Sequence, residues 1–495
     1  MGSFVGAVAL VLNAHFPYVR RSELWPHGEE TLHGVIAESY LPLLSLLHDL
    51  RATRQSVPFS LAVSPILVEQ LGDPLINKRF ALWLAERSSR ARSGLERFDA
   101  SGDGHLAYLC RFYLQLAETA VDTFEKRYAG NIAHGLRDLI GDQIELLLAP
   151  ATAAYLPPLD PGAIRAQIQT GALSILQWAH RRARGLWLPY GGFQSDLTAQ
   201  LDALGVQFVV APSGNGPNLG CIEGSKMFIV RGDREVIQHV LAPGLGYPGD
   251  SLYREFYRRD EDLGLHFWRV TGVDVPLDAK ALYDPYPAFE RAEEHARHWL
   301  KVLHERLRWL SHMEQPPVVV VTLDAEFFGH WWFEGIAWLR FVLRELHASE
   351  EIRTLTLSKA LAEWHHLVPP DPAHQAADCS ANAEIAELWR RLEVANRRMG
   401  RAARAYMDAE GLQERLLTQA ARELLLAASG DWFALIANGS AVNYARRRFD
   451  EHLARFEQLL IYAQSTEPPP DAESYLAHIA ELDNPFPRIN FRIWG

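Results

Sequence analysis

The sequence predicts an α/β fold built around parallel strands. Short apolar runs rich in Val, Ile and Leu recur along the chain, and amphipathic helical stretches separate many of them. Runs without polar alternation are typical of strands buried on both faces, and their alternation with helices indicates parallel pairing in a barrel or a doubly wound sheet. The expected strands are Val5–Leu12, Phe59–Val63, Ile144–Leu148, Gly185–Leu188, Val206–Val210, Met227–Val230, Val318–Leu323 and Thr354–Leu357.

Chain length and helical stretches predict more than one structural unit. The chain has 495 residues, which is more than one hydrophobic core usually holds. Residues from about 74 to 137 are helical in pattern and separate two strands, which predicts an inserted helical subdomain. Strand signals stop after Val368-Pro-Pro-Asp-Pro372. We therefore expect an α/β domain over residues 1–374 and an all-helical C-terminal domain over residues 375–495.

The composition disfavours several classes of partner. Lys and Arg number 49 and Asp and Glu number 61, so the formal charge is −12 and no overall basic field would gather nucleic acid or anionic lipid. The first strand has no basic leader before it, and no apolar run reaches the roughly 18–20 residues that a membrane span requires. Three widely spaced cysteines, Cys110, Cys221 and Cys379, indicate neither a disulfide framework nor a zinc site. We expect a cytoplasmic protein that binds no nucleic acid and no membrane.

Candidate functional residues follow directly after the predicted strands. In a parallel barrel the carboxyl ends of the strands carry the chemistry. Polar and aromatic residues stand at these ends, in the segments Asn13-Ala-His15, Ser64-Pro65, Ala149-Pro-Ala-Thr152, Pro189-Tyr190-Gly191 and Asp324-Ala-Glu326.

The densest of these segments runs from Thr322 to Gly335. It contains four titratable side chains and two adjacent indoles: Asp324, Glu326, His330, Glu334, Trp331 and Trp332. Carboxylates among aromatic rings at a strand end suit glycosidic chemistry, in which apolar neighbours raise the pKa of one carboxyl group so that it holds a proton for the leaving oxygen. The alternative is that these acids only cap the following helix.

Asp324-Ala-Glu-Phe-Phe-Gly-His-Trp-Trp-Phe-Glu-Gly335 resembles the signature of the α-1,4-glucan branching enzymes of glycoside hydrolase family 57, in which the Asp is the general acid/base. Asn13-Ala-His-Phe-Pro-Tyr-Val-Arg20 is similar to the opening strand motif of the family, whose His lines the subsite where the bond is cut. Further similar segments follow in the same order as in the family, namely Glu38–Leu44, Gly246–Asp250, Tyr253–Tyr257, Trp268–Gly272 and Leu425–Tyr444.

The resemblance implies a (β/α)7 barrel, an inserted helical segment and a C-terminal helical domain that helps to build a glucan groove. The implied activity is cleavage of an α-1,4-glucan and transfer of the piece to a 6-hydroxyl group by a retaining mechanism. No metal and no organic cofactor is implied.

The chain departs from the family pattern at the reaction centre. The family nucleophile is a Glu in a Trp-Leu-Pro-Glu segment, whereas this chain reads Trp187-Leu-Pro-Tyr190. The family has an Ala-Thr-His motif on its third strand, whereas Ala151-Thr-Ala153 lacks the imidazole. A retaining mechanism requires a nucleophile about 5–5.5 Å from the acid/base carboxyl group, and a neutral phenol with a pKa near 10 needs a base beside it. No such base is close to Tyr190 in sequence, and Asp196 fits a helix cap better than a stand-in carboxylate.

Six residues are expected to contact substrate, namely His15, Trp25, Trp187, Trp268, His330 and Trp331. Each also has a purely structural interpretation, as a hydrogen-bonded core histidine or a packed indole; stacking on sugar is favoured for Trp25 and Trp268.

Three functions remain open. The first is a catalytically silent member that binds α-glucan and recruits or regulates active glycogen enzymes. The second is a working branching enzyme with a substitute nucleophile. The third is a structural partner of an active homologue that binds no sugar.

Overall fold

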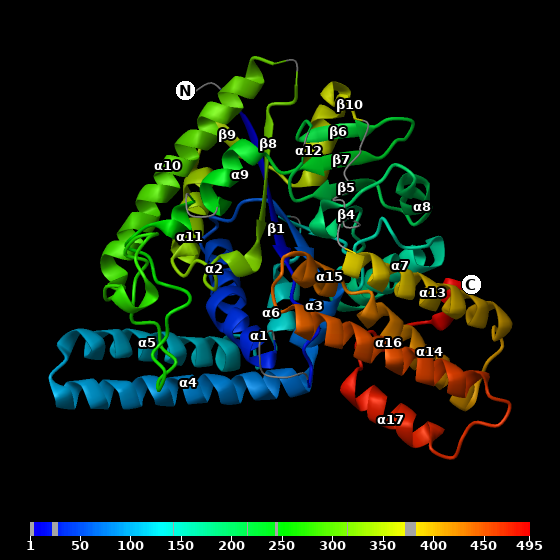
Figure 1. Cartoon of the computed structure of the whole chain (residues 1–495). Helices are drawn as coiled ribbons and strands as arrows, with labels where there is room; N and C mark the ends of the chain where they lie inside the picture. Colours follow the sequence, from blue (N-terminus) through cyan, green and yellow to red (C-terminus); the bar gives the residue numbers. More distant parts are fainter. Residues whose placement is uncertain are drawn as a thin grey trace.

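The computed structural model describes residues 4–21, 28–141, 143–214, 216–242, 246–313, 315–371 and 383–495. Within these ranges, no helix combines the length and apolar character needed to cross a membrane. The strands form two groups, one in the middle of the molecule and one at the upper right, long helices lie around them, and the helices of residues 383–495 pack against one side (Figure 1).

The first sheet is parallel and has the strand order β3-β2-β1-β8, with β9 also paired to β1. Strand β1 is buried along almost its whole length, as its uninterrupted apolar run predicts. The strands of this sheet are β1 (Gly6–Ala14), β2 (Phe59–Val63), β3 (Ile144–Leu147), β8 (Val318–Asp324) and β9 (Ile352–Thr354). The expected strand over Thr354–Leu357 is therefore displaced, because β9 ends at Thr354 and a helix begins at Leu357.

The second sheet has the order β10-β6-β7-β5-β4. It is parallel except that β6 and β7 pair antiparallel. Two of its strands, β6 and β10, are not among the predicted ones. Its strands are β4 (Gly185–Trp187), β5 (Phe208–Ala211), β6 (Leu219–Ile222), β7 (Phe228–Arg231) and β10 (Pro370–Asp371).

A closed (β/α)7 barrel is not confirmed, because the strands form two open sheets. On one side the sheets meet at the bridge between Leu148 and Leu186. There the Leu148 N–H donates to the Gly185 carbonyl oxygen at 2.8 Å, and the Trp187 N–H donates to the Leu148 carbonyl oxygen at 2.7 Å. On the other side the Asp233 N–H donates to the carbonyl oxygen of Val320 in β8 at 2.7 Å. Apolar side chains from both sheets form one inner core, which includes Val11, Leu147, Trp187, Val210, Val230 and Val320.

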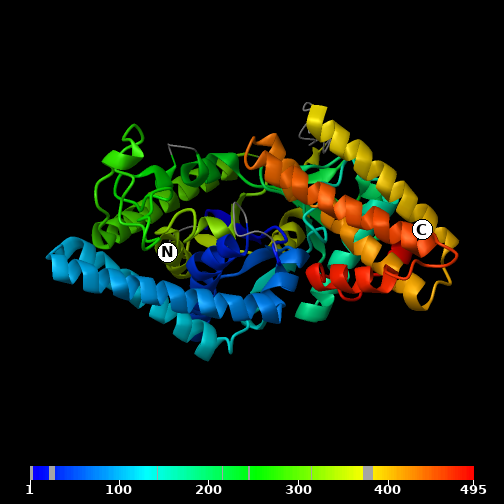
Figure 2. The ribbon, with the colours of Figure 1, turned by 60° about the horizontal axis from the view of Figure 1, so that its bottom comes forward.

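Helices pack around the sheets. They are α1 (Glu29–Val35), the π-helix η1 (Ile36–Tyr40), α2 (Leu41–Ala52), α3 (Pro65–Gly72), α7 (Pro161–Ala179), α8 (Leu197–Ala203), α9 (Arg234–Leu241), α10 (Pro285–Ser311), α11 (Gly335–Ala348) and α12 (Leu357–Trp364). The segment predicted to be a helical insertion contains α4 (Pro74–Ser101) and α5 (Gly104–Asp122), which run side by side (Figures 1 and 2), followed by α6 (Ile132–Leu139). Its status as a separate subdomain stays a prediction.

The C-terminal region is a helical domain, as predicted. Its helices are α13 (Ala383–Ala405), α14 (Gly411–Ala427), α15 (Gly430–Ala437), α16 (Val442–Gln464) and α17 (Ala472–Leu482). Helices α14 and α16 pack along each other, and α13 lies beside them (Figure 2). The domain is tied to the loop after β3, because the Thr152 hydroxyl donates to the Leu425 carbonyl oxygen at 2.8 Å and the Ser429 hydroxyl donates to the Thr152 carbonyl oxygen at 3.1 Å.

A glycine after β8 fits tightly against the π-helix η1. Gly329 adopts a left-handed backbone (φ +99°), and a Cβ atom there would collide with the carbonyl oxygen of Glu38. Gly205 has a similar backbone (φ +81°) but open space around it. We expect Gly205→Ala to lower the free energy of unfolding by about 1–2 kcal/mol, the cost of the left-handed backbone alone. Gly329→Ala should cost at least about 2 kcal/mol more, because the backbone must also move. Equal losses in denaturant unfolding would show that the close contact carries no cost.

Candidate active site

The ends of β1 and β8 bring the first two polar side chains together. The two strands pair in register so that Asn13 lies opposite Asp324. The Asn13 amide donates to the Asp324 Oδ1 at 2.7 Å. Asp324 is exposed to solvent although protein surrounds it on most sides, and this surrounding protein raises its pKa against the opposing effects of Asn13 and His15. Asp324 is thus a solvent-accessible carboxyl group that holds a proton more readily than an ordinary Asp.

Glu326 lies beneath Asp324 and is buried. Its Oε1 accepts hydrogen bonds from the His15 N–H at 2.6 Å and from the Tyr40 hydroxyl at 2.7 Å. Burial, followed by the neighbouring Asp324 charge, raises the pKa of Glu326 to about 7. Glu326 therefore fixes the backbone of His15 from below.

Both ring nitrogens of His15 have partners. The Nδ1 lies 2.8 Å from the Ser64 Oγ, which follows β2, and the Nε2 lies 2.8 Å from the Asp431 Oδ1. Burial would lower the pKa of His15, but the negative charges around it, that of Asp431 above all, outweigh burial and raise it. His15 is therefore held in one orientation and favours the protonated form.

Asp431 comes from the C-terminal helical domain, in the first turn of α15. Besides its contact with His15, its Oδ2 accepts from the Ser429 hydroxyl at 2.7 Å, and its Oδ1 accepts from the Tyr190 hydroxyl at 3.4 Å. Burial alone would raise the pKa of Asp431, but His15 and these hydrogen bonds lower it. Asp431 is thus an ionised carboxylate that joins two residues of the α/β region.

Tyr190 follows β4 in a left-handed backbone conformation (φ +59°). Tyr190 is 42% exposed, and its hydroxyl donates to the buried Asp431. Burial, followed by the charges of Asp431 and Asp324, raises the pKa of Tyr190 well above 10. The phenol is therefore neutral at physiological pH.

Ala153 and Tyr190 both pack against Gly430 at the start of α15. A Cβ atom on Gly430 would collide with the Ala153 carbonyl oxygen and press on the Tyr190 ring. Ala153 is buried and also adopts a left-handed backbone (φ +50°). Gly430 is thus the residue that allows both positions to approach the helical domain.

The three tryptophans that were predicted to contact sugar and that the structure describes differ in how accessible their indoles are. Trp331 is 49% exposed and its ring lies 4.6 Å from that of Phe256, so its indole is accessible. Trp268 is partly buried and Arg258 covers one face of its ring at 3.8 Å. Trp187 is buried in the inner core, which favours the structural interpretation of this indole as a packed side chain.

The remaining two candidates are placed less favourably. His330 is buried, and its Nδ1 lies 3.1 Å from the Glu38 Oε2, while its N–H donates to the Ser39 hydroxyl. This arrangement matches the structural interpretation, in which His330 anchors the loop after β8 to η1. Trp25 lies outside the described residues.

The sequence does not single out Asp431, which lies inside the segment Leu425–Tyr444 that is similar to the family's helical domain. An Asp two residues after a Ser, such as Ser429, is also typical of a helix start, so this local pattern does not distinguish a site residue from a helix-capping acid. The contact of Asp431 with His15 spans 416 residues of chain, so no local pattern reveals it.

Within the described ranges, one group of side chains has the spacing of metal ligands. Ligand atoms of Glu423, His452 and Asp483 lie within 4.8 Å of one another in the core of the helical domain. However, Arg455 donates to the Asp483 Oδ2 at 2.6 Å, and Gln419 donates to the Glu423 Oε1 at 2.9 Å. Burial raises the pKa of both carboxyl groups. The group fits a hydrogen-bonded core network better than a cation site.

Comparison with known proteins identifies the family. The profile of glycosyl hydrolase family 57 matches residues 9–370, and the profile described as "1,4-alpha-glucan branching enzyme, C-terminal" matches residues 391–494. The chain is 31% identical to a 1,4-alpha-glucan branching enzyme of Thermococcus kodakarensis, over 97% of this chain and 77% of that protein. It is 32% identical to a probable 1,4-alpha-glucan branching enzyme of Mycobacterium tuberculosis, over 90% of each chain.

Solved structures show the same relationship. A family 57 branching enzyme of Pyrococcus horikoshii matches with a TM-score of 0.90 and 30% identity, over 99% of this chain and 97% of that one. An alpha-amylase of Thermotoga maritima matches with a TM-score of 0.89 and 27% identity, over 99% of both chains. With matches of this extent, the chain belongs to glycosyl hydrolase family 57 and is a homologue of its 1,4-alpha-glucan branching enzymes.

Proposed function

We propose that this protein binds an α-glucan at the site around Asp324 and His15 but does not cut it. The observation that carries this proposal is the state of Tyr190, which stands where the family resemblance expects the nucleophilic Glu. Its hydroxyl donates to Asp431 and its pKa lies far above physiological pH. A retaining mechanism needs a negative charge near the anomeric carbon, and a neutral phenol supplies none.

The other carboxylates do not replace the missing nucleophile. Asp431 is ionised, but three hydrogen bonds from His15, Ser429 and Tyr190 already engage it. Glu326 is buried beneath the site and bonded to the His15 N–H and to Tyr40. Asp324 alone is exposed, and its raised pKa suits the acid/base role that the resemblance assigns to it. An acid/base without a nucleophile leaves the covalent route incomplete.

Several features support glucan binding without catalysis. The Trp331 indole offers an exposed apolar face of the kind on which sugar rings stack, and it lies in the same loop as Asp324. The polar groups around His15 are held rigidly, which lowers the entropic cost of binding. The same proposal covers a distorted barrel formed by the two sheets and an association of this protein with active glycogen enzymes.

A second candidate function rests on the contact between Tyr190 and Asp431. In this mechanism the Tyr190 hydroxyl transfers its proton to Asp431 while the phenolic oxygen attacks the anomeric carbon. The glycosidic bond breaks, and the proton of Asp324 goes to the leaving oxygen. The 3.4 Å contact supplies the base that such a tyrosine needs. The low pKa of Asp431 opposes it, because a weak base takes a proton from phenol only at high energetic cost.

The first prediction from the proposed function concerns activity. The purified protein should leave the iodine absorbance of amylose unchanged over long incubation and form no α-1,6 branches, because the covalent step lacks a nucleophile. Branch formation that is lost in both Tyr190→Phe and Asp431→Asn would establish the second candidate function in place of the first.

The second prediction concerns binding. Migration of the protein in native gels should be retarded by glycogen or amylopectin. Trp331→Ala should weaken this retardation several-fold, since stacking of a ring on an indole is worth on the order of 1 kcal/mol. Trp309→Ala is the matched control, because Trp309 is 47% exposed on α10 and lies away from the site. No retardation of the unmodified protein by either polysaccharide would favour a structural partner that binds no sugar.

The third prediction concerns restoration of catalysis. Tyr190→Glu combined with Ala153→His should produce reducing ends or branches from amylose when neither single change does, because both groups act at one centre and their effects are non-additive. The new Glu would lie beside Asp431, and repulsion between the two carboxylates raises the pKa of one of them. Activity should therefore increase from pH 5 toward neutrality. Adding Asp324→Asn should abolish it, and activity that survives this change would exclude Asp324 as the acid/base.

A further inference from the structure

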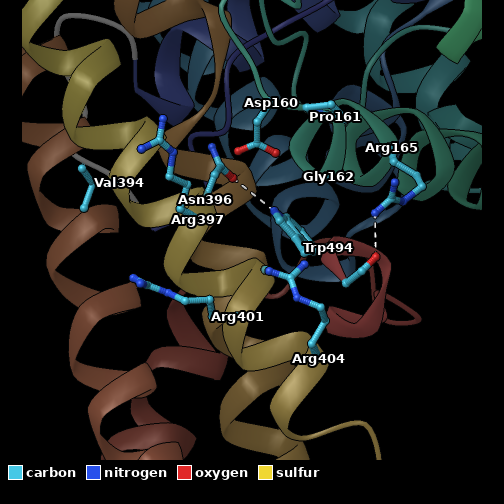
Figure 3. A pocket seen from close by; sticks show the side chains of 12 residues that line it. Asp160, Pro161, Gly162, Arg165, Val394, Asn396, Arg397, Arg401, Arg404 and Trp494 are labelled. Carbon is cyan, nitrogen blue, oxygen red and sulfur yellow. Dashed lines mark hydrogen bonds between the residues drawn. The ribbon is translucent and has the colours of Figure 1, made fainter.

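A second cavity lies between α7, α13 and the last residues of the chain (Figure 3). Its volume is about 630 Å³, which falls within the range of small-molecule sites. It shares no lining residue with the site around Asp324. The lining consists of Asp160, Pro161, Gly162, Arg165, Val394, Asn396, Arg397, Gly400, Arg401, Arg404, Trp494 and Gly495.

Positive charge dominates this lining. Arg397, Arg401 and Arg404 project from the last turns of α13, and Figure 3 shows Arg404 directed toward Trp494 and Arg401 directed away from it. Arg397 pairs with Glu393 on the same helix. Arg401 and Arg404 have no hydrogen-bond or ion-pair partner among the residues that the structure describes. In a chain of net charge −12, two unpaired guanidinium groups on one cavity wall favour an anionic ligand.

The opposite wall adds to this positive potential. The Arg165 Nε and Nη2 donate to the main-chain oxygens of Ile493 at 2.9 Å and Gly495 at 2.8 Å, so its position is fixed. Gly162, in the first turn of the 19-residue helix α7, also lines the cavity. The N-terminal end of a helix carries a partial positive charge. Arg165 and the start of α7 therefore add positive potential to a wall that also carries the Asp160 carboxylate.

The Asp160 carboxylate in the cavity requires a hydrogen-bond donor, not an anionic group. The Asp160 Oδ1 accepts from the Ala163 N–H at 3.0 Å and so begins α7. The Asp160 Oδ2 is buried and has no hydrogen-bond partner. An unpaired buried carboxylate oxygen is costly, and a hydroxyl group donating to it would remove that cost. A ligand that satisfies both features carries an anionic group and hydroxyl groups.

We propose that this cavity binds a phosphorylated sugar, whose phosphate is held by Arg404, with Arg401 adding to the positive potential, and whose hydroxyl group donates to the Asp160 Oδ2. The guanidinium group is suited to phosphate because it can present two parallel N–H donors. The ligand is either a free hexose phosphate or a phosphate ester on a glucan chain. This inference does not rest on glucan binding near Asp324.

The test is isothermal titration of the full chain with glucose 1-phosphate, glucose 6-phosphate, glucose and inorganic phosphate, and with maltodextrin in phosphorylated and unphosphorylated form. At least one phosphorylated sugar should bind with an affinity about tenfold or more above both glucose and inorganic phosphate. Whether the hexose phosphates or the phosphorylated maltodextrin bind more tightly then identifies the source of the ligand.

Variants separate the two contacts. Arg401→Gln with Arg404→Gln should weaken binding of the phosphorylated sugar by about tenfold or more. Asp160→Asn keeps an oxygen that caps α7 and should reduce the preference for the phosphorylated sugar over inorganic phosphate. Arg390→Gln with Arg415→Gln is the charge-matched control, since both arginines form exposed ion pairs outside the cavity. This control should change the affinity by less than about twofold.

Three results would overturn the proposal. One is the absence of saturable binding by every phosphorylated sugar. Another is an equal loss of affinity in the cavity variant and in its charge-matched control, which would mean that only the net charge of the protein matters. The third is inorganic phosphate binding as tightly as the phosphorylated sugars, which would leave the Asp160 contact without a role.

Discussion

The bridge between Asp431 and His15 holds the candidate site together. It joins the helical domain to the end of β1, and the same carboxylate accepts from Tyr190 after β4. Because His15 and Asp431 are largely enclosed by protein, removal of either one would leave a costly unpaired polar group. The charge of Asp431 also favours the protonated form of His15 and disfavours ionisation of Tyr190. One interaction thus sets both the geometry of the site and the protonation states within it.

In the function proposed above, this arrangement removes the catalysis of the family and keeps a binding site. Asp324, to which the resemblance assigns the acid/base role, is exposed and accepts a hydrogen bond from Asn13. The residue across from it is a neutral phenol, tethered by its hydroxyl to Asp431. The polar groups around His15 bond mainly to one another, which stabilises a fixed surface but leaves no free nucleophilic carboxylate. The accessible indole of Trp331 then becomes the main feature offered to a sugar ring.

The sequence predicted the elements whose signal is local. Phe59–Val63 is a strand with the predicted bounds, because an uninterrupted apolar run must be buried on both faces. Strands β6 and β10 were missed because they have four and two residues and carry no such run. The strand ends at His15 and Asp324 identified the site for the same local reason. Asp431 and the burial of Trp187 depend on how distant segments pack, so neither could be predicted from a pattern within one segment.

The decisive measurement is a crystal structure of the protein soaked with a long maltooligosaccharide. We expect an intact glucan that lies against Trp331 and reaches Asp324, with Tyr190 unmodified and its hydroxyl still directed at Asp431. A glycosyl group covalently attached to Tyr190, or a glycosidic bond cut at this site, would show that the site is catalytic, and a site that stays empty while glucan binds elsewhere on the molecule would show that it does not bind glucan.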